Sequence, residues 1–131
     1  MIVLDASVLI AHLDSSDSHH QSAGILLEAT GAEALGASVI TIAETLVSPA
    51  RAGRLEDALL AFEKLGLVDL ELGPGSARRL AGLRSETSLK MPDCCVLLAA
   101  REHRGRVASF EKGLNAAALS LGLGLAGPSP S

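Results

Sequence analysis

Short aliphatic runs alternate along the chain with longer segments in which apolar residues recur at helical spacing. The short runs at residues 2–4, 37–40, 67–72, 106–110 and, more weakly, 123–126 predict strands. Short runs of this kind are typical of strands that helices cover on both faces. The alternation therefore predicts an α/β fold with a mostly parallel sheet.

The ends of two helices can be predicted from local signals. Ser18 begins a Ser-His-His-Gln capping box, so we expect a helix from there to about Ala29. A second helix is indicated by apolar residues at helical spacing, followed by Gly66 where a left-handed cap is expected. Its apolar positions are Leu55, Leu59, Leu60 and Phe62.

A third helix is expected to open at Pro92, whose missing amide is harmless in a first turn, and to stop at Gly105. No repeat or linker divides the chain. We expect residues 1–126 to form a single domain and residues 127–131, which are rich in Gly, Pro and Ser, to form a mobile tail.

The composition suits one aliphatic core. Of the 131 residues, 48% are hydrophobic and 20% charged, which fits a globular domain of ordinary size. Trp and Tyr are absent and Phe occurs twice, which argues against aromatic cages and base-stacking platforms.

The cysteines and the amino-terminal segment bear on the compartment. Cys94 and Cys95 are adjacent, so they provide neither a disulfide scaffold nor a zinc site of their own. The first residues lack a basic leader and reach Asp5 at once, which argues against a signal peptide. The uncharged segment 113–131 is interrupted by Gly and Pro and makes a poor membrane span. We expect a cytoplasmic protein that does not enter a membrane.

Charge is distributed unevenly along the chain. Residues 1–77 hold 3 basic and 11 acidic side chains, whereas residues 78–112 hold 8 basic and 4 acidic ones, within a net charge of −4. A separate basic segment can engage phosphates, although solvated helix faces would give the same pattern. The candidates for such phosphate contacts are Arg78, Arg79, Arg84 and Lys90.

Four acids stand where an open α/β sheet places its functional sites. Asp5 ends the first strand, Glu44 interrupts an apolar stretch one turn into a helix, Asp93 follows Pro92, and Glu111 follows the strand at 106–110. Clustered carboxylates repel one another and stay ionised most easily around a hard divalent cation. The set predicts Mg²⁺ or Mn²⁺ and disfavours zinc.

Each acid also has a purely structural interpretation. Asp93 could be a first-turn acid that the helix dipole stabilises, and Glu111 a loop acid paired with Lys112. Asp5 and Glu44 fit such roles less well, because both interrupt apolar runs that would otherwise serve the core.

Four segments in order resemble the motifs of PIN-domain nucleases, and most closely those of VapC-type toxins from bacterial toxin–antitoxin pairs. They are residues 3–11 (VLDASVLIA), 42–46 (IAETL), 91–100 (MPDCCVLLAA) and 109–114 (SFEKGL). The resemblance extends from residue 1 to about residue 125. It implies a three-layer α/β/α sandwich, an Mg²⁺- or Mn²⁺-dependent endoribonuclease and a cognate antitoxin that blocks the site.

Matched position by position, the resemblance implies that the catalytic quartet is Asp5, Glu44, Asp93 and Glu111. Asp5, Asp93 and Glu111 would bind the metal, and Glu44 would bind it through water or orient the attacking water. Ser7 and Ser109 match the family's supporting hydroxyl or amide positions, although Ser7 could instead cap the first helix. The resemblance also implies a homodimer and an RNA substrate, whose phosphates we expect Arg78, Arg79, Arg84 and Lys90 to contact.

One departure from the family pattern and several rival classes bear on the function. The family's fourth acid is more often Asp, and Glu111 carries one further methylene, so a catalytically weak binding module for RNA or an antitoxin is the alternative function. Ser7 stands where a haloacid-dehalogenase-like phosphatase has its second Asp. A receiver domain would need an acidic pair at the first strand, and a glycine-rich phosphate loop is absent.

Overall fold

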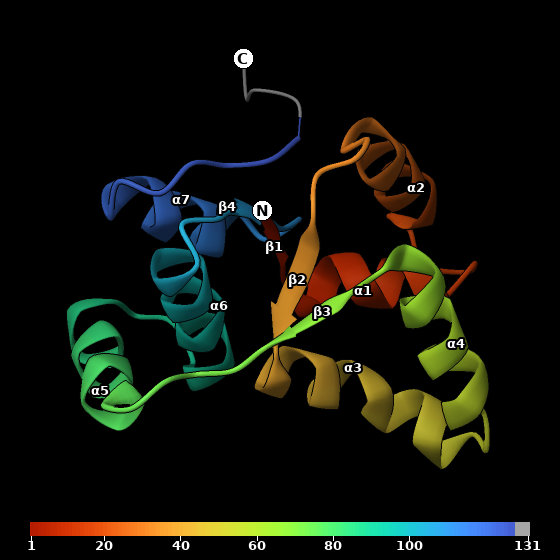
Figure 1. Ribbon diagram of the computed structural model, residues 1–131, viewed down its shortest axis with the longest axis horizontal. Coiled ribbons are helices and arrows are strands. Elements are labelled where there is room, and N and C mark those ends of the chain that lie inside the picture. Colours follow the sequence, from red (N-terminus) through yellow and green to blue (C-terminus); the bar gives the residue numbers. More distant parts are fainter. Residues whose placement is uncertain (128–131) are drawn as a thin grey trace.

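The computed structural model describes residues 1–127 and shows four short strands and seven helices in alternation (Figure 1). The strands are β1 (Ile2–Leu4), β2 (Leu35–Ser38), β3 (Val68–Leu70) and β4 (Arg106–Ala108). The helices are α1 (Ala6–Leu13), α2 (His20–Ala29), α3 (Val39–Arg51), α4 (Leu55–Leu65), α5 (Ser76–Glu86), α6 (Met91–Glu102) and α7 (Lys112–Ser120).

The four strands form one parallel sheet in the order β3-β2-β1-β4. The chain moves outward from β1 through β2 to β3 and then returns to place β4 on the other side of β1. The order therefore reverses between β1 and β4, and ligand sites of open α/β sheets form at such a reversal. Asp5 and Ser109 follow directly after these two strands.

Alternation of side chains along β1 divides the core into two layers. Val3 belongs to a cluster with apolar residues of α5, α6 and α7, while Ile2 and Leu4 belong to a cluster with residues of α1, α2 and α4. These two groups of helices lie on opposite sides of the sheet (Figure 1). The predicted α/β/α sandwich with a parallel sheet is confirmed.

Three strands end earlier than the apolar runs suggest, and after the second strand a polar side chain starts a helix at once. The second strand stops at Ser38 instead of Ile40, since the Ser38 hydroxyl accepts a hydrogen bond from the Thr41 amide at 3.2 Å and caps α3. β3 and β4 are likewise shorter than predicted. The weak fifth strand at 123–126 is reduced to one bridge between Leu125 and Val107.

The capping-box prediction at Ser18 is wrong. α2 begins one residue later than expected with His19 in the capping position, and no side chain caps it. Asp17 accepts a hydrogen bond from the His19 amide at 2.8 Å instead, so a local turn takes the place of the box. The predicted end of this helix at Ala29 is confirmed.

The helix expected around residues 55–62 is present and ends at Gly66, which is left-handed as predicted. Its buried side chains are those of Ala58 and Phe62. Leu59 and Leu60 stay 40% and 50% exposed, contrary to the core role that their spacing suggested.

The predicted stop of α6 at Gly105 is also only partly correct. The helix ends at Glu102, and the residue with left-handed backbone is Arg104 at φ 51°. Gly105 is needed for packing instead, because a β-carbon there would lie 2.7 Å from Cγ2 of Val3.

The expected single domain over residues 1–126 remains a prediction. The expected mobile tail falls mostly on residues 128–131, which lie outside the described residues. Within residues 1–127, no helix combines the length and apolar character that crossing a membrane requires.

Candidate active site

Asp5 stands at the reversal point of the sheet because β1 ends there and α1 begins. Its amide donates to the Ala108 carbonyl of β4, and its side chain caps α1 by accepting from the Val8 amide at 3.1 Å. The residue is only 2% exposed. Burial of a cap residue this deep in a sheet edge is unusual for a purely structural Asp.

Two serines hold the Asp5 carboxylate from either side. Ser7 Oγ donates to Oδ1 at 2.6 Å, and Ser109 Oγ donates to Oδ2 at 2.5 Å. Ser7 in turn accepts from the Phe110 amide, and Ser109 accepts from the Glu111 amide. The structure thus joins both predicted supporting residues to Asp5 and to the segment after β4, while the helix cap is made by Asp5 itself.

The hydrogen bonds leave Asp5 one free direction. Oδ1 accepts from two donors, Ser7 Oγ and the Val8 amide, whereas Oδ2 accepts only from Ser109 among the described residues. Each carboxylate oxygen offers about two acceptor positions, so Oδ2 keeps one for a cation or a water.

Asp93 and Glu111 lie near Asp5 at the carboxyl edge of the sheet. We call the surface formed by these three acids the rim. Asp93 is in the first turn of α6, which Pro92 helps to start, and Glu111 precedes α7 without capping it. Burial raises the pKa of Asp93 first, and the charge of Asp5 raises it further. Burial likewise raises the pKa of Glu111, followed by the charges of Asp93 and Asp5.

Burial also raises the pKa of Asp5, against the lowering effect of the bonds from Ser109, Ser7 and Val8. The charge of Asp5 therefore disfavours the ionisation of Asp93 and Glu111, and the charge of Asp93 disfavours that of Glu111. Groups of this kind gather at functional sites, and a cation removes their repulsion.

As the side chains stand, no group of three or more His, Cys, Asp or Glu residues within 1–127 is close enough to hold a metal ion. The donors nevertheless suit Mg²⁺ or Mn²⁺, because they are all carboxylate oxygens with mutual repulsion and one free Asp5 acceptor. Asp93 and Glu111 are not fully buried, so their side chains have rotamers available with which to approach Asp5.

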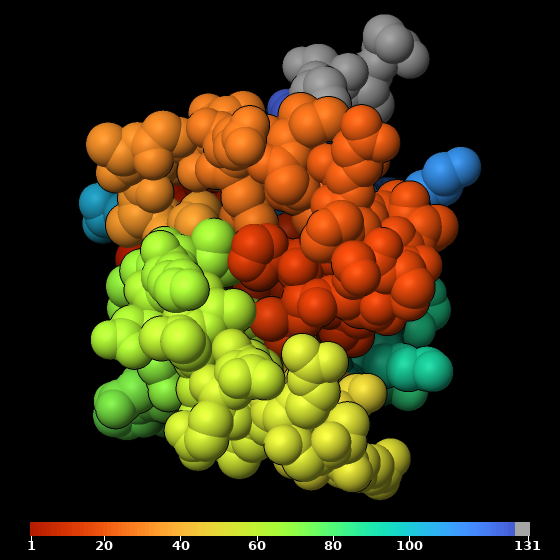
Figure 2. Space-filling model, turned by 90° about the vertical axis from the view of Figure 1, so that its right-hand side faces the viewer, coloured from red at the N-terminus to blue at the C-terminus, as the bar shows by residue number. Residues whose placement is uncertain are grey.

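Glu44 is placed differently from the other three acids. The sequence suggested a carboxylate buried among aliphatics, but Glu44 is exposed, because the buried stripe of α3 consists of Thr41 and Thr45. It lines a pocket of about 440 Å³ between α1, α3 and α4, together with His12 and other residues. In Figure 2, α1 (red) meets α3 and α4 (yellow) on this side of the molecule.

Glu44 is still near the rim, because its charge contributes, after burial and Cys94, to raising the pKa of the Cys95 thiol in α6. It is not among the charges that raise the pKa of Asp5, Asp93 or Glu111. Of the four predicted acids, Asp5, Asp93 and Glu111 are therefore linked by the effect of charge on pKa. Glu44 lies near them without such a link.

The four predicted RNA-contacting cations divide into two pairs. Lys90 precedes α6 and lowers the pKa of both Asp93 and Glu111, so it stands at the rim. Arg84 is in the last turn of α5, where its charge lowers the pKa of the Cys94 thiol against the larger, raising effect of burial. Both lie near the end of α6 that carries Asp93.

Arg78 and Arg79 lie at the opposite end. Arg79 donates to Glu102 at 2.7 Å, near the last turn of α6. Asp93 and Glu102 are nine residues apart in one helix, which is a rise of about 13 Å. Any RNA that reaches these two arginines must therefore extend along α5 and α6.

Three residues of the site were missed from the sequence. Asn115 of α7 donates to the Ser109 carbonyl at 3.0 Å and fixes the turn after β4. Asn115 stands one helical turn after Glu111, and that spacing could have indicated a contact with the turn that precedes the helix. Phe110 contributes its amide to Ser7, and His19 stacks on its ring, which no local pattern reveals.

Comparisons with known proteins bear on this geometry. The model of the PIN domain matches residues 2–119. A toxin–antitoxin complex from Klebsiella pneumoniae is similar, with 25% identity, a TM-score of 0.72 and coverage of 86% of this chain and 89% of the other. No curated protein matches the chain.

Two further structures are similar in fold. FitAcB from Neisseria gonorrhoeae shares 23% identity at a TM-score of 0.71, with 98% of each chain covered. VapC20 of Mycobacterium tuberculosis, described as a sarcin–ricin loop cleaving toxin, shares 17% identity at a TM-score of 0.73, with 89% of this chain and 95% of that chain covered.

Proposed function

Since the chain belongs to the PIN-domain family, we propose that it is a metal-dependent endoribonuclease that acts as the toxin of a toxin–antitoxin pair. The observation that carries the proposal is that Asp5 lies at the point where the sheet order reverses and that its charge acts on both Asp93 and Glu111. The similarity to a toxin–antitoxin complex and to a toxin that cleaves the sarcin–ricin loop supports it.

Asp5, Asp93 and Glu111 would hold Mg²⁺ or Mn²⁺, with Asp5 acting through the free position on Oδ2. A bound ion of this type lowers the pKa of a water and stabilises negative charge on a phosphoryl group. Ser7 and Ser109 keep the Asp5 carboxylate in one orientation, so its free acceptor position points in a fixed direction.

Glu44 would act from the side of the pocket between α1, α3 and α4. Its exposed carboxylate can accept a proton or a hydrogen bond from a water at the edge of the rim. Lys90 and Arg84 would take the flanking phosphates, and Arg78 and Arg79 would take phosphates farther along α5.

The proposed partners are a cognate antitoxin and a second copy of the chain. The antitoxin is supported by the toxin–antitoxin complex among the similar structures. The homodimer would bury Val47 of α3 and Leu59 and Leu60 of α4, which remain exposed on two helices that pack against each other.

The test is cleavage of total bacterial RNA by the purified protein with Mg²⁺, with Mn²⁺ and with chelator. Asp5→Asn and Asp93→Asn should abolish metal-dependent fragments, and Asp69→Asn, an exposed Asp of β3, serves as the matched control. Circular dichroism and thermal unfolding establish that each variant is folded.

Intact RNA with every metal, with all variants folded and no antitoxin present, would contradict the nuclease proposal. The separation of the acids in the structure would then favour the alternative function, a PIN-like module that binds RNA or an antitoxin without cutting. Glu111→Asp would test whether the longer side chain is the reason.

A further inference from the structure

We infer that the rings of His19 and Phe110 form a stacking subsite for an unpaired RNA base beside the acidic rim. The inference rests on the proposed nuclease function and names the form of RNA that the site takes. The two rings are far apart in the sequence and meet only in the fold.

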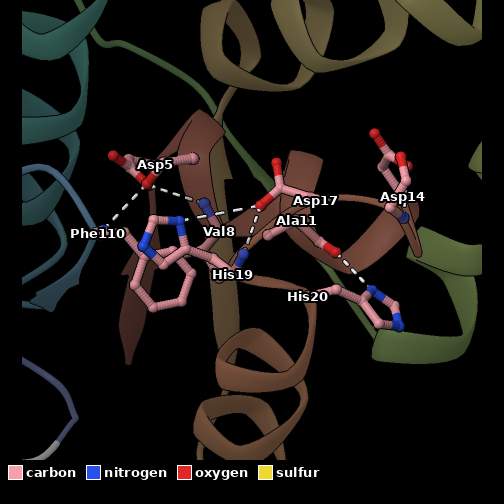
Figure 3. Close-up of polar contacts among 10 residues, drawn as sticks. Asp5, Val8, Ala11, Asp14, Asp17, His19, His20 and Phe110 are labelled. Atoms are coloured by element: carbon pink, nitrogen blue, oxygen red, sulfur yellow. Dashed lines mark hydrogen bonds and ion pairs between the residues drawn. The ribbon is translucent and has the colours of Figure 1, made fainter.

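The rings of His19 and Phe110 are parallel. Their centroids are 4.6 Å apart and their planes differ by 10° (Figure 3). The chain contains two Phe and no Trp or Tyr, and Phe62 is in the core. The only other Phe is Phe110, which is partly buried at the edge of a core cluster and stacks there with His19.

Phe110 is tied to the site by hydrogen bonds. Its amide donates to Ser7 Oγ at 3.0 Å, and Ser7 Oγ donates to Asp5 at 2.6 Å. Glu111 is the next residue. The stack therefore has a fixed position relative to the carboxylates.

His19 is fixed from its own side. Asp17 Oδ1 accepts from the His19 amide at 2.8 Å and lies 3.9 Å from the ring nitrogen Nδ1 (Figure 3). The His19 side chain is nevertheless 53% exposed. Phe110 covers one face of the ring, so an added base would stack on the opposite face, and the hydrogen bonds that hold both residues limit the ordering that this requires.

An unpaired nucleobase fits this subsite best. Every base has a flat π face, so stacking on an aromatic ring accepts any base, whereas a paired helix keeps those faces covered. The absence of Trp and Tyr argued against base stacking from the sequence, but that argument counted no histidines. His19 supplies the second ring.

The first test compares RNA cleavage by His19→Ala, His19→Phe and His103→Ala, the last being a His at the far end of α6. Loss of one stacked base should raise KM for single-stranded RNA about tenfold with little change in kcat. His19→Phe should restore KM, since it keeps the ring, and His103→Ala should equal the wild type. An unchanged KM in His19→Ala, or failure of His19→Phe to restore it, would overturn the inference while leaving the nuclease proposal intact.

The second test does not depend on cleavage. The chain has no Trp, so His19→Trp introduces a single fluorophore at the subsite, and His103→Trp provides the matched control. Both are made in the Asp93→Asn background to keep the RNA whole. A short single-stranded RNA should quench the fluorescence of the His19→Trp variant, whereas the same RNA as a duplex, or an abasic ribose-phosphate strand, should not.

Equal quenching by the abasic strand, or none by single-stranded RNA, would overturn the stacking subsite even if RNA is cut. Quenching specific to unpaired bases would support it even if the wild type cuts nothing, in which case the nuclease proposal alone fails.

Discussion

At the scale of single residues, the ionisation of Asp5 links the site to the stability of the fold. Its pKa is raised above 3.8 in the folded chain by burial. The folded state therefore holds its proton more tightly than the unfolded state does. Stability from this group is fully present below its unfolded pKa and is lost as pH rises through the folded value.

We predict that, in chelator, the free energy of unfolding of the wild type falls relative to Asp5→Asn as the pH is raised from about 4 toward 7. The charge of Asp5 also raises the pKa values of Asp93 and Glu111, so Asp5→Asn relieves part of both shifts and changes stability in the same direction. Asp14 and Glu33, whose pKa values are lowered by bonds from Ser16 and Arg106, act oppositely but are common to both proteins. Urea unfolding at each pH measures the difference, and parallel curves would contradict the prediction.

A bound metal ion should reverse the loss of stability that ionised Asp5 causes at neutral pH. Mg²⁺ at neutral pH is expected to raise the unfolding temperature of the wild type and to leave Asp5→Asn nearly unchanged, because an ion that binds only the folded site stabilises it by mass action. Calorimetry with and without chelator provides the measurement. Equal stabilisation of both proteins would mean that the ion binds elsewhere.

Ser109 gives a further residue-scale prediction. Ser109→Ala removes the bond to Asp5 Oδ2 and leaves the Glu111 amide without its acceptor, which should lower stability by about 1 to 3 kcal/mol and strongly reduce cleavage. Ser120→Ala, at the exposed end of α7, is the control and should change neither quantity. Urea unfolding and the RNA cleavage assay measure the two effects, and full activity in Ser109→Ala would show that Asp5 keeps its orientation without this bond.

At the scale of elements, close packing between the end of α6 and β1 depends on Gly105. Gly105→Ala would bring Cβ to 2.7 Å from Val3 Cγ2 and 3.2 Å from the Met1 carbonyl oxygen, and should destabilise the chain by about 1 to 3 kcal/mol. Gly24→Ala in α2 meets no atom within 4 Å and should stabilise it by roughly 0.5 to 1 kcal/mol. Thermal unfolding compares the two, and a neutral Gly105→Ala would show that β1 can shift.

The sequence predicted the parallel sheet, two helix ends, and the rim positions of Asp5, Asp93 and Glu111, because these depend on local period and on strand ends. It predicted no helix over α5, whose exposed arginines and single buried Leu83 leave a weak apolar stripe. It misjudged the ends of β2 and α6, where a Ser38 cap and a left-handed Arg104 decide the boundary.

The failure at Glu44 has a different cause. An apolar stretch around an acid suggested burial, but α3 turns Val39 and Ile40 outward and buries two threonines instead. Which face of a helix meets the core depends on its neighbours, here α1, α4 and α6, and that information is not local. The His19–Phe110 stack was missed for the same reason, since its members are far apart in the sequence.

At the scale of the whole molecule, the uneven charge predicts a path for RNA over α5 and α6. Lys90→Ala should weaken RNA binding at low salt and reduce the slope of log K against log salt by about one, because Lys90 stands at the rim. Arg79→Ala should have a smaller effect, since Arg79 already pairs with Glu102. Fluorescence anisotropy over a salt series separates them, and a larger effect of Arg79→Ala would place the main contact at the far end of α6.

Because the first strand, β1, pairs with the last, β4, the site is completed only late in synthesis. Asp5 leaves the ribosome first, but its partner Ser109 follows about a hundred positions later, and Asn115 after that. A growing or truncated chain therefore carries the central acid without the segment that orients it. Under the proposed function, a chain that ends before β4 would be harmless to the RNA around it, and cutting would begin only once β4 docks beside β1.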